Sequence, residues 1–413
     1  MQPSYRRARA GCYFANIAMA AVCCLSPLLF VTFHEQYGIS YTLLGLLSVV
    51  CFGVQLSIDL IFSFFARFFN IHVTVRATGL FAFVGSLIYA ILPPLFPEHA
   101  YVFLVIGTLI FSVSAGLCEV LISPVIAAIP SDNPEREMSR LHSIYGWGVV
   151  SVVIVGTLLL KLFGTDRWYL MALVMSLVPL VLFLLFARAE LPPVQMGGKD
   201  GKGGSMPRGV LLCMLCIFLG GATECTMTTW CSSYLETALG IPKTVGDVCG
   251  LALFAFLLGI GRTIYAKRGR HIERVLTLGM AGSAISYLIA ALSPFPALGL
   301  VGCVLTGFCC AMLWPGTLIM MEKHYTGVGV VGYALMAAGG DAGGSVGPQI
   351  VGAVVDGVIA SDLAPALAER LSVTVDQLGM KVGILTASLF PILGFFLLLG
   401  IQKAVSAGKV KKD

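Results

Sequence analysis

The strongest constraint on this chain is a series of twelve apolar stretches, each long enough to cross a lipid bilayer. A transmembrane helix needs about 20 mainly apolar residues, because the hydrocarbon core is roughly 30 Å thick. Backbone polar groups must be paired inside that core, so stretches of this length form helices there. The sequence therefore predicts an all-α polytopic membrane protein with twelve transmembrane helices. They are expected at residues 11–33, 41–65, 77–96, 101–129, 141–163, 167–188, 209–236, 243–266, 273–293, 297–321, 328–357 and 382–403.

Charged residues are too few for a soluble protein of this size. Of 413 residues, 11% are charged and 58% are hydrophobic, whereas an average soluble domain has about 25% charged residues. The net charge of +5 comes without a basic cluster interleaved with aromatic residues, so we expect no nucleic-acid partner. The 13 cysteines lie almost entirely in apolar stretches and fit packing positions better than a disulfide or metal framework. We predict no metal and no cofactor.

A polar segment divides the predicted spans six and six. Residues 189–208 are rich in glycine and scattered charges, which is typical of a flexible linker. We therefore predict an N-terminal six-helix bundle over residues 1–188, a cytoplasmic linker over 189–208 and a C-terminal six-helix bundle over 209–413. A second polar insert, residues 361–381, predicts a short surface helix.

The distribution of basic residues predicts the orientation of the chain. If both termini are cytoplasmic, twenty of the 26 Lys and Arg lie in cytoplasmic segments and five in outer loops. Cytoplasmic loops of membrane proteins carry such an excess of basic residues. We therefore expect a multi-pass protein of the cell (plasma or inner) membrane with both termini in the cytoplasm.

The two halves share a short internal similarity. Residues 116–124 (GLCEVLISP) and 307–315 (GFCCAMLWP) match in Gly, Cys and Pro at an offset of 191 positions. Together with the division into six and six spans, this match favours two parallel, pseudo-symmetric repeats. Coincidence among small residues is the alternative.

Five of the charged residues lie well inside the predicted spans. A charge at the bilayer centre costs at least about 2.5–3.5 kcal/mol, and it persists where it faces a bundle interior, a water-filled cavity or a partner. These residues are therefore the first candidates for function. They are Asp59, Glu119, Glu224, Arg262 and Asp341.

Glu119 is expected near the middle of the membrane. It lies about ten residues before the end of its span, which is roughly 15 Å along the helix axis. Ser123 shares its face one turn later, so the two side chains could bind a polar solute. A carboxyl group at this depth could also bind and release a proton. The alternative is a carboxyl group that neighbouring helices hold for structure alone.

Glu224 is central in its own span and is followed by Thr228 and Trp230. We predict solute and proton binding at Glu224, with the flat ring of Trp230 stacking on a planar or cyclic solute. Gly220 and Gly221 directly before it permit close helix packing. A structural role in that packing is the alternative for Glu224.

Three of the five charged residues fit positions that open or close a passage. Asp59 and Arg262 lie near the inner ends of their spans, where each could pair with a helix end or a neighbouring helix. Snorkelling to the headgroups is the alternative, and it fits Arg262 better. Asp341 lies among glycines in residues 338–348, which predicts a closely packed, bendable helix rather than a phosphate-binding loop.

Four further residues are candidates of other kinds. His142 and Tyr145 begin the fifth span, and a histidine can titrate near neutral pH, so we group both with the gating residues; an ordinary interfacial role is the alternative. Asn16 in the first span and Trp314 in the tenth could line a cavity, with packing as the alternative.

Several of these segments resemble a known family. Gly259-Ile260-Gly261-Arg262 resembles the Gly-Arg motif of fucose-permease-like bacterial members of the major facilitator superfamily. Residues 141–148 (LHSIYGWG) resemble their fifth span, and Glu119 before Ser123-Pro124 resembles the acidic residue of their fourth span. Residues 340–348 resemble span eleven of related bacterial permeases.

The resemblance implies a secondary active transporter rather than an enzyme. In that family two halves rock about a cavity lined by spans one, four, seven and ten. This chain would move a small organic solute, such as a sugar or another polar nutrient, by alternating access with protons as the coupling ion, and it would act as a monomer in the lipid bilayer. The resemblance places five residues along the substrate path, with Glu119 as the proton-coupling group: Asn16, Glu119, Glu224, Trp230 and Trp314.

Three other functions remain open at this point. A drug or metabolite exporter would have the same architecture, and the aromatic content of 10% permits it. A polytopic membrane enzyme would need a convergent set of catalytic residues, and the six histidines show no metal-ligand spacing. A non-transporting sensor would carry a signalling domain that the sequence does not show.

Overall fold

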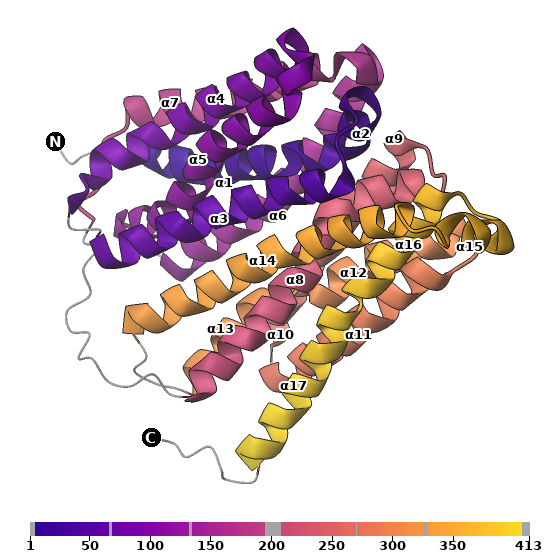
Figure 1. The fold of residues 1–413 in the computed structure, drawn as a ribbon. Coiled ribbons are helices and arrows are strands. Elements are labelled where there is room, and N and C mark those ends of the chain that lie inside the picture. The colour runs from indigo at the N-terminus through magenta and orange to yellow at the C-terminus, as the bar shows by residue number, and fades with distance from the viewer. Residues whose placement is uncertain are drawn as a thin grey trace. The chain divides into compact units, whose positions relative to one another are not determined.

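The computed structural model describes residues 5–65, 68–131, 134–194, 208–269, 271–324 and 329–406. Within these ranges the regular elements are all helices (Figure 1). Twelve of the helical segments are long and apolar enough to cross a membrane. The all-α fold class and the number of spans predicted from the sequence are therefore confirmed.

The first six spans are built from long helices joined by short turns. They comprise α1 Arg6–Leu25, η1 Pro27–Leu29, α2 Phe30–Tyr37, α3 Tyr41–Phe65, α4 Ile71–Leu95, η3 Pro97–His99, α5 Ala100–Ala128, α6 Pro134–Phe163, η4 Thr165–Arg167 and α7 Trp168–Ala187. Span one is one continuous segment of three helical pieces, because Pro27 lacks the N–H that would continue α1.

The last six spans contain more interruptions. They comprise α8 Arg208–Thr237, α9 Lys243–Val245, η5 Gly246–Ala252, α10 Leu253–Arg268, α11 Ile272–Leu292, α12 Pro296–Cys310, α13 Leu313–His324, α14 Gly329–Ile359, α15 Ala364–Leu371, α16 Val375–Ala387 and α17 Leu389–Ser406. Spans eight, ten and twelve each consist of more than one helical piece.

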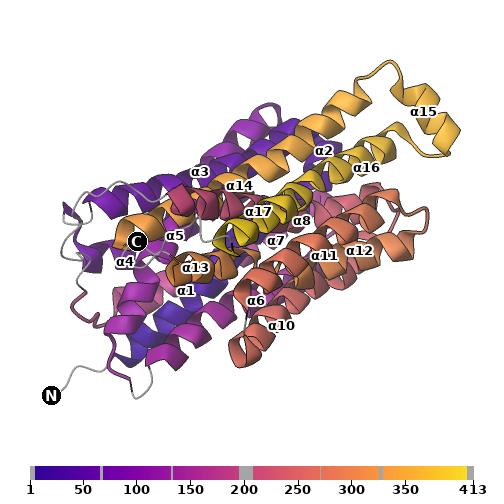
Figure 2. The same ribbon diagram turned by 90° about the horizontal axis from the view of Figure 1, so that it is seen from below.

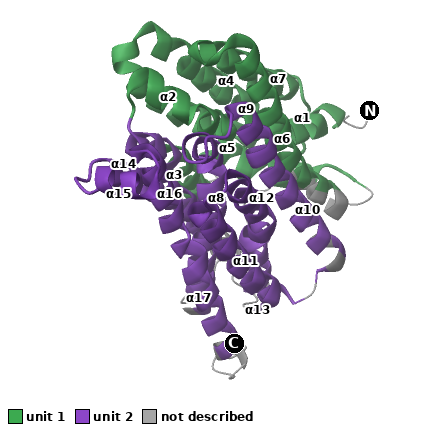
Figure 3. Cartoon of the chain, turned by 90° about the vertical axis from the view of Figure 1, so that its right-hand side faces the viewer, with its two compact units in different colours: residues 1–39, 50–200 green, residues 40–49, 201–413 purple. Residues whose placement is uncertain are grey.

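The chain divides into two compact units (Figure 3). Unit 1 contains residues 1–39 and 50–200, and unit 2 contains residues 40–49 and 201–413. The predicted linker over 189–208 lies mostly outside the described residues, so its flexibility stays a prediction. The short segment 40–49 groups with unit 2, although the remainder of α3 belongs to unit 1.

Glycines and a buried aromatic cluster hold unit 1 together. The helix α4 packs against α5 and α7. A Cβ at Gly85 would lie 2.5 Å from the backbone nitrogen of Phe111, so only glycine permits this approach of α4 to α5. Towards one end of the unit, the rings of Phe33 and Trp168 meet edge to face with centroids 4.9 Å apart. Both rings are fully buried, which anchors α2 against the start of α7.

In unit 2 the helix α8 packs along α14, and α11 packs along α12 (Figures 1 and 2). A Cβ at Gly343 of α14 would overlap the carbonyl oxygen of Phe218 in α8. A Cβ at Gly339 would be 2.9 Å from the carbonyl oxygen of Met214. The glycine-rich stretch that the sequence analysis singled out is therefore the surface of α14 that contacts α8.

The start of α3 is capped by a side chain from α14. The backbone N–H groups of Tyr41 and Thr42 donate to the two carboxylate oxygens of Asp356 at 3.1 and 2.6 Å. A carboxylate at a helix N-terminus satisfies free amides and interacts favourably with the helix dipole. Residues 40–49 and α14 both belong to unit 2, and this cap explains why the first turns of α3 are grouped there.

The predicted surface helix in the last polar insert is confirmed as α15. The twelfth span, however, starts seven residues earlier than predicted, at Val375 instead of residue 382. Thr374 and Gln377 form a capping box at its N-terminus, so a polar first turn precedes the apolar stretch that the sequence pattern detected.

Candidate functional site

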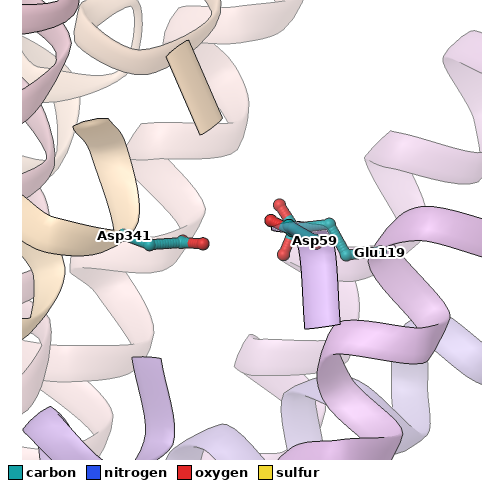
Figure 4. Close-up of side chains that lie close together, drawn as sticks. All are labelled: Asp59, Glu119 and Asp341. Carbon is teal, nitrogen blue, oxygen red and sulfur yellow. The ribbon is translucent and has the colours of Figure 1, made fainter. Parts of the chain in front are cut away.

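Two carboxylates lie close together in unit 1. Oxygens of Asp59 on α3 and Glu119 on α5 are within 4.8 Å of one another (Figure 4). Asp59 is 6% exposed, and Glu119 is half-buried. The sequence predicted both as intramembrane charges but did not predict their pairing.

Gly116 allows α3 and α5 to approach at this position. A Cβ there would lie 3.0 Å from Cβ of Ile58 and 3.1 Å from Cα of Gln55. Both distances are shorter than an ordinary carbon–carbon contact. Because Gly116 lies one turn before Glu119 on α5, the close packing at the glycine brings the Glu119 carboxylate to Asp59.

The other predicted substrate residues of unit 1 have different surroundings. Ser123 is half-buried, one turn beyond Glu119 on the same face of α5. Asn16 of α1 donates from Nδ2 to the carbonyl oxygen of Leu141 in α6 at 3.0 Å. Its amide therefore links α1 to α6, and a part in substrate binding stays a prediction for both residues.

The fifth span covers Ser143–Phe163, close to the predicted residues 141–163. Its helix α6 begins earlier, at Pro134, so charged turns precede the apolar stretch. Glu137 in these turns accepts a hydrogen bond from the Tyr13 hydroxyl group and lies 3.7 Å from Arg9 Nε. His142 and Tyr145 lie on the same helix; Tyr145 is half-buried, and the His142 side chain lies outside the described residues.

An ion pair inside the membrane span is the main feature of unit 2. Arg262 Nη2 on α10 donates to both carboxylate oxygens of Glu224 on α8, at 3.0 and 3.3 Å. The side chains are 34% and 17% exposed, so neither is fully enclosed. The sequence predicted separate roles for them, a gate at Arg262 and a substrate and proton ligand at Glu224. The structure brings them together.

A proline supplies the second contact of Arg262. In a continuous helix the carbonyl oxygen of Ala311 would accept the N–H of residue 315, but Pro315 has no N–H. The helix is interrupted here between α12 and α13, and Arg262 Nε donates to the Ala311 oxygen at 3.0 Å. A backbone carbonyl released by a helix break thus fixes the guanidinium group beside Glu224.

Gly261 explains why Arg262 can reach this break. A Cβ at Gly261 would lie 2.6 Å from Cβ of Ala311, so a larger residue would push α10 away from α12. Gly259 has open space around it, with no atom within 4 Å of a Cβ. In the Gly-Ile-Gly-Arg motif, the second glycine is therefore the one that the packing requires.

Trp314 follows the helix break and lies against two glycines. A Cβ at Gly340 of α14 would be 2.5 Å from Trp314 Cζ2, and one at Gly221 of α8 would be 3.1 Å from its Cζ3. The ring is half-buried, so part of it is accessible to a solute. Asp341, next to Gly340 on α14, is 2% exposed.

Trp230 does not have the environment that ring stacking on a solute needs. Its side chain is fully buried, and its indole N–H donates to the carbonyl oxygen of Pro348 at 3.0 Å. The ring lies 6.0 Å from that of Tyr41. Trp230 is therefore a packing residue of α8 in this structure, in contrast to its predicted role in substrate stacking.

Sequence reasoning missed a buried polar cluster at the start of span eight. Asp247 in the π-helical turn η5 is fully buried and accepts a hydrogen bond from the Ser232 hydroxyl group. Lys243 Nζ lies 3.8 Å from Asp247 and 3.7 Å from Glu236. The spacing of Lys243 and Asp247, four residues apart on one helical face, was the signal that could have indicated an ion pair.

Twelve candidate membrane spans in two units define a polytopic membrane protein. A sequence model of the Major Facilitator Superfamily matches residues 10–348. The chain belongs to this superfamily. No curated protein matches the sequence.

Solved structures with the same fold are transporters. A bacterial homologue of the human lysosomal transporter Spinster, inward-facing and occupied, has a TM-score of 0.78 at 12% identity and covers 98% of both chains. A D-xylose–proton symporter has a TM-score of 0.74 at 14% identity, over 94% of this chain and 97% of that one. The fucose:proton symporter of E. coli has 0.57 at 15% identity, over 96% and 98%. At these identities the likeness concerns the fold alone.

Proposed function

We propose that this protein carries a small polar organic solute across the plasma membrane together with protons, by alternating access. Uptake is the direction that we propose, with both termini in the cytoplasm and a monomer as the functional unit. Proton symporters of sugars with the same fold, among them those of xylose and fucose, support the class of substrate. The observation that carries the proposal is the pair of carboxylates formed by Asp59 and Glu119.

Two carboxylates at this distance suit reversible proton binding. Negative charges a few ångströms apart repel strongly in a low-dielectric environment, and a single proton between them removes the repulsion. Asp59 is buried, whereas Glu119 is half-buried, so a proton can reach the pair through Glu119. We assign proton coupling to Glu119, with Asp59 as its partner instead of an independent gate.

Other residues complete the proposal. Ser123 shares a helix face with Glu119, and Trp314 presents a partly exposed ring, so both are proposed as substrate contacts. Asn16 and Glu224 lie on helices corresponding to spans one and seven and are proposed to contribute to the same path. The proposed gating residues are His142, Tyr145, Arg262 and Asp341.

The test is solute-driven proton movement in proteoliposomes. The purified protein is reconstituted with a pH-sensitive dye in the lumen, and sugars, sugar acids, amino acids and nucleosides are added one at a time outside. A transported substrate should acidify the lumen, and Glu119→Gln should reduce the initial rate by about tenfold or more, because an amide cannot carry the proton.

The matched control is Glu98→Gln, which makes the same change at an exposed position in η3. It should acidify at the wild-type rate. Proton movement by Glu119→Gln equal to that of the wild type would refute proton coupling at this residue. Accumulation of labelled substrate in inverted but not right-side-out vesicles would show export in place of uptake.

A further inference from the structure

The ion pair in unit 2 defines a chemical class of substrate. We propose that Arg262 binds the carboxylate of an organic anion, and that the substrate takes the place of Glu224 on the guanidinium group when Glu224 binds a proton. This inference rests on the proposed function in that it assumes a transported solute. It adds that the solute carries a carboxylate.

Glu224 shows how a ligand carboxylate would be held. Both of its oxygens accept hydrogen bonds from Arg262 Nη2, at 3.0 and 3.3 Å. A single guanidinium nitrogen therefore holds both oxygens, and such charge-assisted hydrogen bonds between arginine and a carboxylate are stronger than neutral ones. The backbone bond from Arg262 Nε to Ala311 at 3.0 Å does not involve Glu224, so the guanidinium group keeps its orientation when the carboxylate partner changes.

The ion pair is accessible although it lies in a membrane span. Arg262 and Glu224 are 34% and 17% exposed in their side chains, whereas Thr223 and Thr226 on other faces of α8 are fully buried. Intramembrane charges that remain exposed face water-filled space. A solute from that space can therefore reach Arg262 without unfolding α8 or α10.

Arg262 is the positively charged member of the pair, and two cysteines and a tyrosine lie near it. Cys225 follows Glu224 on α8, and Cys310 ends α12 directly before Ala311. Tyr287 of α11 donates its hydroxyl proton to the carbonyl oxygen of Thr223 at 2.7 Å.

Cations on the other elements that pack against α8 have different contacts. Lys243 of α9 lies against Asp247 and Glu236. Lys323 of α13 lies 2.6 Å from Glu273, which also contacts His324. In α16, Lys381 donates to the carbonyl oxygen of Ser293, and Lys403 of α17 is exposed.

Charge balance links the substrate to a proton. Charged residues within membrane spans pair with one another, so a carboxylate partner stabilises Arg262 throughout the cycle. In the empty protein Glu224 supplies it. When a substrate carboxylate binds Arg262, the proton taken up by a Glu224 oxygen keeps the site at the same net charge. When the substrate leaves, Glu224 releases the proton and returns to Arg262.

The test is equilibrium binding to the purified full-length protein without a proton gradient. Thermal unfolding is followed at pH 6 and pH 8 with lactate, succinate, gluconate, glucuronate and benzoate, each beside its uncharged amide. A ligand that binds the folded protein raises the unfolding temperature. At least one carboxylate should do so, with an affinity about tenfold higher at pH 6 than at pH 8, and its amide should not.

Two substitutions separate the roles of the ion pair. Glu224→Gln cannot ionise, so it should bind the carboxylate with the same affinity at both pH values. Arg262→Gln should weaken binding by about thirtyfold or more, because the ligand charge then has no partner. Glu236→Gln, the same change on α8 at a carboxylate that pairs with Lys243, is the control and should keep the wild-type pH dependence.

Several outcomes would overturn the inference. Stabilisation by amides alone, by no carboxylate, or equally at both pH values in the wild type would each do so. If Arg262→Gln fails to fold, Arg262→Lys and Glu224→Gln are measured in its place. A pH dependence of binding in Glu224→Gln equal to that of the wild type contradicts the replacement of Glu224 by the substrate on Arg262. Carboxylate binding without proton-driven uptake would reject the proposed coupling but keep the inference. Proton-driven uptake of a neutral solute, unchanged in Arg262→Gln, would support the proposed function and reject the inference.

Discussion

At the residue scale, glycines determine how closely the helices of each unit approach. Gly116 faces α3, and a Cβ at Gly307 would overlap the carbonyl oxygen of Phe254 in α10. These two glycines are the matching positions of the internal sequence similarity. Each lies where the fourth span of its half meets the second, so the match between the halves has a structural reason in packing, beyond coincidence among small residues.

Gly343→Ala tests the packing of α14 on α8. A methyl group at this position would overlap the Phe218 carbonyl oxygen and lie 2.8 Å from the backbone nitrogen of Ala222. Backbone atoms cannot rotate away, so the helices must separate. We expect a loss of about 1–3 kcal/mol and a fall of roughly 2–10 °C in the unfolding temperature, measured with a thiol-reactive dye on the purified protein.

Gly357→Ala provides the comparison for that measurement. Gly357 lies on the same helix, but no atom is within 4 Å of a Cβ there. Alanine has the higher helix propensity, so this variant should unfold at the wild-type temperature or slightly above. Equal falls in both variants would mean that the glycines act through helix flexibility rather than through contact with α8.

At the scale of elements, breaks in the helices are as informative as the helices themselves. The fourth span is a continuous helix through Pro124, whereas the tenth is divided before Pro315. The break in the tenth span is associated with a charged side chain, because Arg262 Nε donates to the Ala311 carbonyl oxygen in place of the missing N–H. Interrupted helices with free carbonyl groups are typical of binding sites in transporters.

Pro315→Ala tests whether the break positions Arg262. An alanine restores an N–H that can donate to Ala311, so α12 and α13 should join into one helix. The restored backbone bond replaces the one from Arg262, and the clash of the proline ring with the preceding turn is removed, so the unfolding temperature should rise by roughly 2–4 °C. Arg262 would lose its backbone acceptor, and substrate affinity should fall by about tenfold.

Pro296→Ala is the matched change in the same span. Pro296 is the first residue of α12, where an N–H would have no helical acceptor. Both unfolding temperature and substrate affinity should match the wild type. If Pro315→Ala likewise left affinity unchanged, the hydrogen bond from Arg262 to Ala311 would have no part in binding.

At the scale of the whole molecule, the sequence predicted the spans far better than the pairs between them. Span number follows from apolar length alone, which is a local property. The pairing of Asp59 with Glu119, and of Arg262 with Glu224, depends on which helix faces meet, and no spacing within one helix encodes that. Asp247 was missed because it lies near a span end, where a charge costs little in an isolated helix.

The orientation of the molecule is the remaining prediction, and it rests on the excess of basic residues in alternate loops. An epitope tag after residue 413 of the full-length protein should be recognised by antibody only in permeabilised spheroplasts. A tag at residue 361, between α14 and α15, should be recognised in intact ones. A tag within residues 195–207 is the cytoplasmic control. Recognition of the terminal tag in intact spheroplasts would invert the topology, and Asp356, which caps α3, would then lie at the cytoplasmic end.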